Sequence, residues 1–134
     1  PSYIWKVDPT LYLVSADGVV LDPTSQETQM VILVDVERRP VGVGDIVDAK
    51  ALAAARYLRN VLPSTVGITP RYFEYSRTLG VVLPTDRGYR VAFGFGDDLP
   101  TKVITFRALL ETLAQQHAPI QLVDLRFPER PYFR

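Results

Sequence analysis

Short apolar runs separated by turn residues dominate the first third of the chain. Two mainly apolar runs, Leu11 to Ser15 and Val19 to Asp22, flank the step Asp17-Gly18. This step favours a tight turn because glycine accepts a positive φ angle, so the pattern predicts a β-hairpin. After a turn-rich stretch at 23–29, Met30 to Val34 form a continuous apolar run that suits a short strand buried on both faces.

The following segment has the period of an α-helix. Asp48 is a residue type that caps helix N-termini, and the segment after it is rich in alanine. Its apolar residues recur at near-helical spacing and share one face: Leu52, Ala55, Leu58 and Leu62. Proline cannot continue a helical hydrogen-bond ladder, so we expect this helix to stop before Pro63.

Three further apolar segments predict an antiparallel meander. They cover 71–76, 79–83 and 89–95, with turn residues at 85–88. The last segment alternates with a period of two and places these residues on one face of a strand: Tyr89, Val91, Phe93 and Phe95.

A second helix and a returning strand complete the pattern. Asp98 or Thr101 caps this helix, which extends to about Gln116 and has an inner stripe of Val103, Phe106, Leu110 and Leu113. The chain then returns as a strand at 120–127. We therefore predict an α+β fold in which two α-helices pack on one face of a mixed or antiparallel β-sheet.

Composition narrows the possible classes of function. With 134 residues, 47% of them hydrophobic and 22% charged, the chain has the profile of one folded domain. Lys+Arg and Asp+Glu both number 15, so no net field attracts nucleic acid or an anionic membrane. The absence of cysteine excludes disulfides, thiolate metal sites and a cysteine nucleophile. The chain starts at Pro1 and its single methionine is Met30, so we expect a fragment whose targeting segment lies outside it.

Candidate catalytic and metal-binding residues are few. His117 is the single histidine, and its position after a helix is typical of a partner for the helix dipole. Gly94 to Asp98 has the glycines and acids of a ligand loop, but it lacks the Lys and Ser/Thr of a P-loop and the spaced oxygen ligands of a calcium loop. We assign Asp97 and Asp98 to helix capping, and predict no catalytic residue, cofactor or metal ion.

The C-terminal segment offers a function without catalysis. Prolines at 128 and 131 follow the strand at 120–127, which predicts that this strand lies at a sheet edge. An extended peptide could add there as a further strand, with Phe127, Tyr132 and Phe133 as anchors. In the alternative, Asp124 and Arg126 form a partly buried ion pair and the tail folds back over the core.

Several motifs together resemble the extracytoplasmic β domain of the FtsQ/DivIB family of cell-division proteins. Tyr12 to Gly18 resembles the family's Tyr-Leu-Val-Asp-x-x-Gly, although Ser15 departs from the usual Asp. Gly44-Asp45 and the alanine-rich segment resemble its middle helix, and Arg90 to Lys102 resembles its strand, glycine turn and Lys-bearing final helix. Val123-Asp124-Leu125-Arg126-Phe127 is the closest match.

The resemblance implies a β domain at 1–127 and a C-terminal tail at 128–134, with a POTRA domain and one transmembrane helix upstream. It implies a non-catalytic divisome scaffold, anchored in the cell membrane with this domain outside the cytoplasm, that recruits FtsB and FtsL for septum formation. The family's contact with FtsB is a terminal strand, which here corresponds to these residues: Asp124, Leu125, Arg126, Phe127, Tyr132 and Phe133.

Two other functions remain open at this point. The first is an enzymatic or small-ligand-binding domain that uses the turn from Gly94 to Asp98 with nearby arginines such as Arg90. The second is a β domain from another envelope-assembly protein, which would share the scaffold character but recruit other partners.

Overall fold

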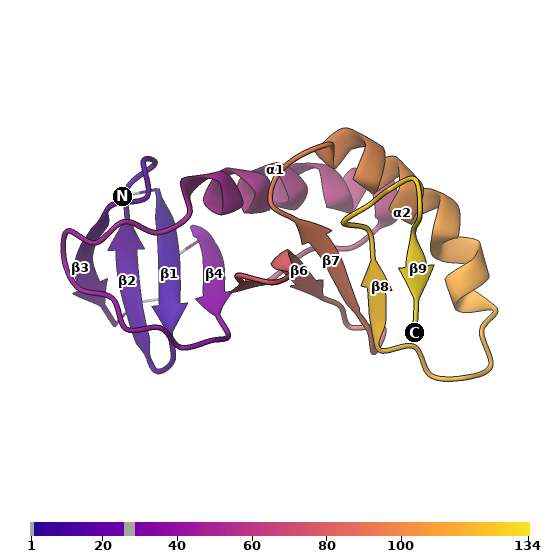
Figure 1. Cartoon of the computed structure of the whole chain (residues 1–134), viewed down its shortest axis with the longest axis horizontal. Helices are drawn as coiled ribbons and strands as arrows, with labels where there is room; N and C mark the ends of the chain where they lie inside the picture. The colour runs from indigo at the N-terminus through magenta and orange to yellow at the C-terminus, as the bar shows by residue number, and fades with distance from the viewer. Residues whose placement is uncertain (1, 26–28) are drawn as a thin grey trace.

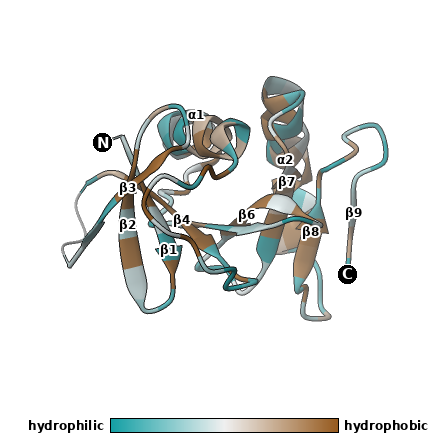
Figure 2. Ribbon diagram, turned by 60° about the vertical axis from the view of Figure 1, so that its left-hand side comes forward, coloured by the Kyte–Doolittle hydropathy of each residue, from teal (hydrophilic) through white to brown (hydrophobic). Residues whose placement is uncertain are grey.

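The structure, a computed structural model, describes residues 2–25 and 29–134. Within these ranges it contains nine strands and two helices, and both helices lie on the same face of one mixed sheet (Figures 1 and 2). This is the predicted α+β fold. Residues 26–28 of the predicted turn-rich stretch lie outside the described ranges.

The N-terminal half of the sheet is built from four strands: β1 (Tyr3–Val7), β2 (Thr10–Val14), β3 (Val20–Thr24) and β4 (Val31–Asp35). The first three are antiparallel, and β4 pairs parallel to the other side of β1. The predicted hairpin is confirmed as β2 and β3, and the predicted buried strand as β4. Gly18 is required in the hairpin because it has a φ of 86° and a Cβ there would lie 2.6 Å from the Val47 carbonyl oxygen.

The C-terminal half begins with the predicted meander, which is confirmed as β5 (Phe73–Ser76), β6 (Gly80–Pro84) and β7 (Arg90–Gly94). Two more strands follow, β8 (Leu122–Asp124) and β9 (Tyr132–Phe133). The strand order across the sheet is β3-β2-β1-β4-β5-β6-β7-β8-β9. The two ends of the sheet are therefore β3 and β9 (Figure 1).

Both helices connect parallel neighbouring strands. α1 (Ala49–Val66) links β4 to β5, and α2 (Leu99–Ala114) links β7 to β8. The two crossovers advance in the same direction across the sheet and start from strands of the same orientation. Because such crossovers are right-handed, both helices are placed on one face.

α1 continues past the predicted stop at Pro63 and ends at Val66, where Gly67 has a φ of 73°. The prediction was wrong because it weighed the proline without the tertiary packing. An internal proline costs about 3 kcal/mol. Leu62 and Val66 are both buried in the core, and burial of each such side chain contributes about 1.5–3 kcal/mol. Asp48 caps the helix as predicted, accepting a hydrogen bond from the Ala51 N–H at 3.0 Å.

α2 has most of the predicted inner stripe. Val103, Phe106 and Leu113 are buried, and Leu110 is partly buried against the same core. Asp98 occupies the N-cap position with a φ of 51° but makes no side-chain capping hydrogen bond, so its predicted capping role is not confirmed. Neither helix in the described ranges is long and apolar enough to cross a membrane.

Pro63 gives a stability test of the α1 assignment. Pro63→Ala restores an N–H to the helical ladder, which raises the free energy of unfolding by about 3 kcal/mol. The unfolded chain of the variant is more flexible, which lowers the same free energy by up to about 1 kcal/mol. We expect a gain of about 2 kcal/mol in the free energy of unfolding, measured by urea denaturation. Ser64→Ala, at the adjacent exposed position, should change it by less than about 0.5 kcal/mol. An unchanged or lower value for Pro63→Ala would contradict the packing argument.

Candidate functional site

The candidate site is the C-terminal end of the sheet, formed by β8 and β9. β8 pairs parallel with β7 on one side and antiparallel with β9 on the other, with Val123 opposite Phe133 and Asp124 opposite Tyr132. The prediction that the strand at 120–127 forms the edge is therefore wrong. The chain reverses after Phe127, whose carbonyl accepts a hydrogen bond from the Arg130 N–H at 2.9 Å, and β9 takes the edge position.

The backbone of β9 leaves hydrogen-bonding groups on its outer side. The Arg134 N–H donates to the Leu122 carbonyl at 3.0 Å, and the Leu122 N–H donates to the Arg134 carbonyl at 3.2 Å. Since neighbouring residues of a strand direct their backbone groups to opposite sides, the N–H and C=O of Phe133 point away from β8. Pro131, the next residue that faces outward, has no N–H to offer.

The opposite end of the sheet differs. The Val20 N–H on β3 donates to the Asp45 carbonyl at 2.8 Å, and the Val20 carbonyl accepts from the Gly44 N–H at 2.8 Å. Pro23, further along β3, cannot donate a hydrogen bond. The loop before α1 therefore covers part of this edge, while β9 has no such cover among the described residues.

A buried carboxylate determines the geometry of the terminal edge. Asp124 is 2% exposed and accepts hydrogen bonds from the Arg126 N–H at 3.0 Å, from Nε at 3.0 and 3.1 Å and from Nη2 at 2.7 Å. The predicted ion pair is thus confirmed. The backbone bond closes an Asx turn at the end of β8, and the side chain of Phe127, which follows this turn, is exposed.

The charge state of Asp124 follows from this arrangement. Burial opposes ionisation, but the hydrogen bonds from the Arg126 side chain and backbone outweigh it. The pKa of Asp124 therefore lies below the ordinary value of 3.8. The ion pair is complete at neutral pH.

The other predicted site residues fall into two groups. Phe127 is 57% exposed with the Arg126 guanidinium 5.7 Å from its ring centre, and Tyr132 is 49% exposed. Leu125 is fully buried, and Phe133 packs partly against the same core. The structure thus brings Asp124, Arg126 and Tyr132 together with an exposed aromatic ring, while the Leu125 side chain lies inside the domain.

The burial of Lys102 was not predicted from the sequence. This side chain is fully buried, and its ammonium donates to the Phe93 carbonyl at 2.8 Å and to Asp97 at 3.2 Å. A lysine between Leu99 and Phe106 on the apolar stripe of α2 was the available signal. Asp97 is a partner of Lys102, which corrects its predicted capping role.

The turn from Gly94 to Asp98 is used by the fold itself. A Cβ on Gly94 would lie 3.2 Å from the Lys102 ammonium, and a Cβ on Gly96 would lie 3.4 Å from the Lys50 carbonyl of α1. Among residues 2–25 and 29–134, no group of three or more acidic or histidine side chains could hold a metal ion. These contacts add no support for a ligand loop here.

Comparison with known proteins identifies the family. The family model described as "Cell division protein FtsQ/DivIB, C-terminal" matches residues 3–126. The chain therefore belongs to the FtsQ/DivIB family of cell division proteins. Proteins named Cell division protein FtsQ from Chloroflexus aurantiacus and Chloroflexus aggregans are each 29% identical to it over 136 residues. The alignments cover 100% of this chain and 48% of each relative, so the chain spans about half their length.

The lowered pKa of Asp124 predicts a pH-dependent contribution to stability. Asp124→Asn should lower the free energy of unfolding by about 2 kcal/mol at neutral pH, because hydrogen bonds to a charged group contribute about 1.5–3 kcal/mol. The ionised form stabilises the fold above the ordinary aspartate pKa, and this contribution is lost as the pH falls through the lowered pKa. Urea unfolding curves should therefore show the two proteins converging below about pH 4. A constant difference down to about pH 2 would contradict the assignment.

Proposed function

We propose that this domain is a non-catalytic scaffold that recruits FtsB- and FtsL-type partners to the divisome through its terminal sheet edge. The observation that carries the proposal is the outward N–H and C=O of Phe133 on β9, beside the exposed rings of Phe127 and Tyr132. A partner segment would add to β9 as a further strand, and its side chains would contact the aromatic residues.

Backbone pairing supplies a limited part of this interaction. Because Pro131 has no N–H, the outer side of β9 offers the Phe133 N–H as its donor within the strand. A ladder this short needs further contacts, and aromatic side chains that are already exposed supply large contact areas at low entropic cost. We therefore assign partner affinity chiefly to Phe127 and Tyr132, and the direction of the added strand to Phe133.

The rest of the protein is proposed from the family. Upstream of this domain we place a POTRA domain and a single membrane-spanning helix, so that the β domain lies outside the cytoplasm. Regulation of septum formation would then pass through the bound partners, with no reaction catalysed by this domain.

A pair of substitutions at Phe133 tests strand addition. Phe133→Pro removes the aromatic ring and the outward N–H, whereas Phe133→Ala removes the ring alone. Neither disturbs the N–H groups that bond to β8. In calorimetric titrations with the extracytoplasmic segment of FtsB from the same organism, Phe133→Pro should bind at least about fivefold more weakly than Phe133→Ala, since one hydrogen bond to a buried partner group contributes about 1–3 kcal/mol.

The outcomes separate the parts of the proposal. Equal affinities of the two Phe133 variants would contradict strand addition but leave side-chain docking in place. The double variant Phe127→Ala with Tyr132→Ala should abolish measurable binding while circular dichroism shows a folded domain. A wild-type domain that does not bind the segment would contradict the proposed partner.

A further inference from the structure

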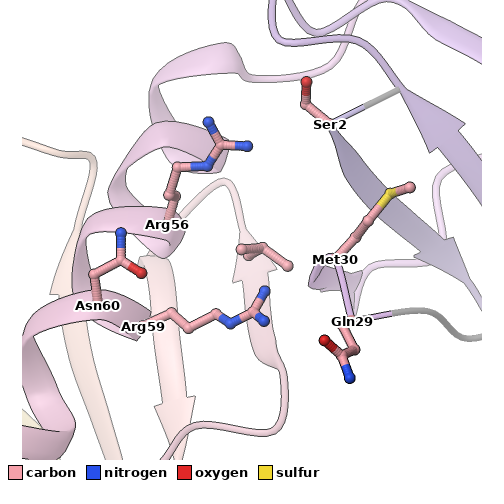
Figure 3. Close-up of a pocket in the computed structure, with 7 residues that line it drawn as sticks. Ser2, Gln29, Met30, Arg56, Arg59 and Asn60 are labelled. Atoms are coloured by element: carbon pink, nitrogen blue, oxygen red, sulfur yellow. The ribbon is translucent and has the colours of Figure 1, made fainter.

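A second polar surface lies far from the terminal edge, between α1 and the beginning of the N-terminal strands. A hollow of about 560 Å³ separates Arg56, Arg59 and Asn60 on α1 from Ser2 and Met30 (Figure 3). Arg59 extends from the helix toward Met30, and Arg56 lies one turn earlier on the same side (Figure 3). We call this hollow the basic groove.

Arg56 and Arg59 give the groove positive charge, and none of the described residues that line it carries a carboxylate. Ion pairs elsewhere in the domain engage other cations, including Arg90 with Glu74 and Arg126 with Asp124. Arg56 and Arg59 have no ion pair within the described ranges, and none of the described lining residues is Asp or Glu. In a chain with zero formal net charge, this is a local excess of positive charge among the described residues.

The arginines are partly fixed in place. The Arg56 guanidinium lies 4.7 Å from the ring centre of Tyr3, which is 3% exposed. Such stacking orients the planar group and leaves its edge N–H donors available for a carboxylate. A bound anion would therefore contact a guanidinium whose conformational freedom is already reduced in the free domain.

The spacing of these groups matches an extended acidic segment. Arg56 and Arg59 are three residues apart on α1, which places their Cβ atoms about 5–6 Å apart. Alternate residues of an extended chain are separated by about 6.6 Å. An adjoining hollow of about 140 Å³ shares Arg59 and adds Arg71, so the positive charge extends beyond the basic groove.

We propose that the basic groove binds an extended acidic peptide segment of a partner protein, with carboxylates at alternate positions paired to Arg56 and Arg59. Asn60 and Ser2 can bond the backbone of such a segment. Among the described residues the groove has no large exposed apolar side chain, apart from Tyr72 in the adjoining hollow, so it lacks the anchor that insertion into a lipid surface needs. This site is separate from the terminal edge and would let the domain hold a second segment or partner.

The probe is an acetylated, amidated peptide, Gly-Glu-Ser-Glu-Ser-Glu-Gly, compared with the same peptide carrying Gln in place of Glu. Amide chemical shifts of the isotope-labelled domain report binding. We expect the Glu peptide to shift Ser2, Arg59 and Asn60 saturably and the Gln peptide to leave them unchanged. Arg56→Gln with Arg59→Gln should weaken binding at least about tenfold, because both bidentate contacts are removed.

Arg107→Gln is the matched control, since Arg107 is also exposed and has no ion pair in the described ranges but lies on α2. It should bind the Glu peptide like the wild type. The proposal would be overturned if the double variant bound the Glu peptide as tightly as the wild type. It would also be overturned if the peptide shifted amides at any charged site of the domain and not specifically those of the groove. In a third outcome, the domain would sediment with anionic phosphatidylglycerol vesicles, this binding would depend on Arg56 and Arg59, and the peptide would not bind. That result would overturn the proposal in favour of a lipid headgroup. None of these results depends on FtsB binding at β9.

Discussion

The handedness of two crossovers determines how this domain is organised. The links from β4 to β5 and from β7 to β8 start from strands of the same orientation and advance in the same direction, so right-handed connections place α1 and α2 on one face. One sheet face then forms the core, in which Trp5, Phe93 and Phe106 are fully buried. Because the sheet stays open, two edges remain, and the properties of those edges determine where a partner strand can bind.

The two edges have different physical characters. A loop and a proline limit pairing at β3, where Val20 is bonded on its outer side to residues 44 and 45. β9 has the opposite arrangement, because its residues bond inward to β8 and Phe133 directs its backbone groups outward. Natural sheets usually protect an exposed edge against unwanted pairing. A short edge strand with a proline beside it limits unspecific pairing while still offering one donor.

Local pattern predicted the elements well and their tertiary roles poorly. The hairpin, the meander and both helices follow from periodicity because each is encoded within about 20 residues. Pro63 was misjudged because Leu62 and Val66 are buried in a core that is formed by segments distant in the sequence. Lys102 was missed because its acceptor, the Phe93 carbonyl, is brought close by the fold. β9 has two residues, too few to show a period, so its pairing with β8 could not be predicted from the sequence. The outward direction of the Phe133 N–H and C=O, which follows from this pairing, could not be predicted either.

Asp124 connects the stability of the domain with the shape of its terminal edge. A carboxylate this deeply buried must be hydrogen-bonded, and Arg126 meets this need from only two residues away. The same contact lies at the end of β8, before the exposed Phe127, and the chain then returns as β9 with Tyr132 opposite Asp124. The ion pair that satisfies this buried carboxylate therefore lies at the point where the chain leaves β8 and approaches the exposed aromatic residues. Both exposed rings of the terminal edge lie beside this pair, because the Arg126 guanidinium is 5.7 Å from the Phe127 ring centre and Tyr132 is paired with Asp124 across the two strands.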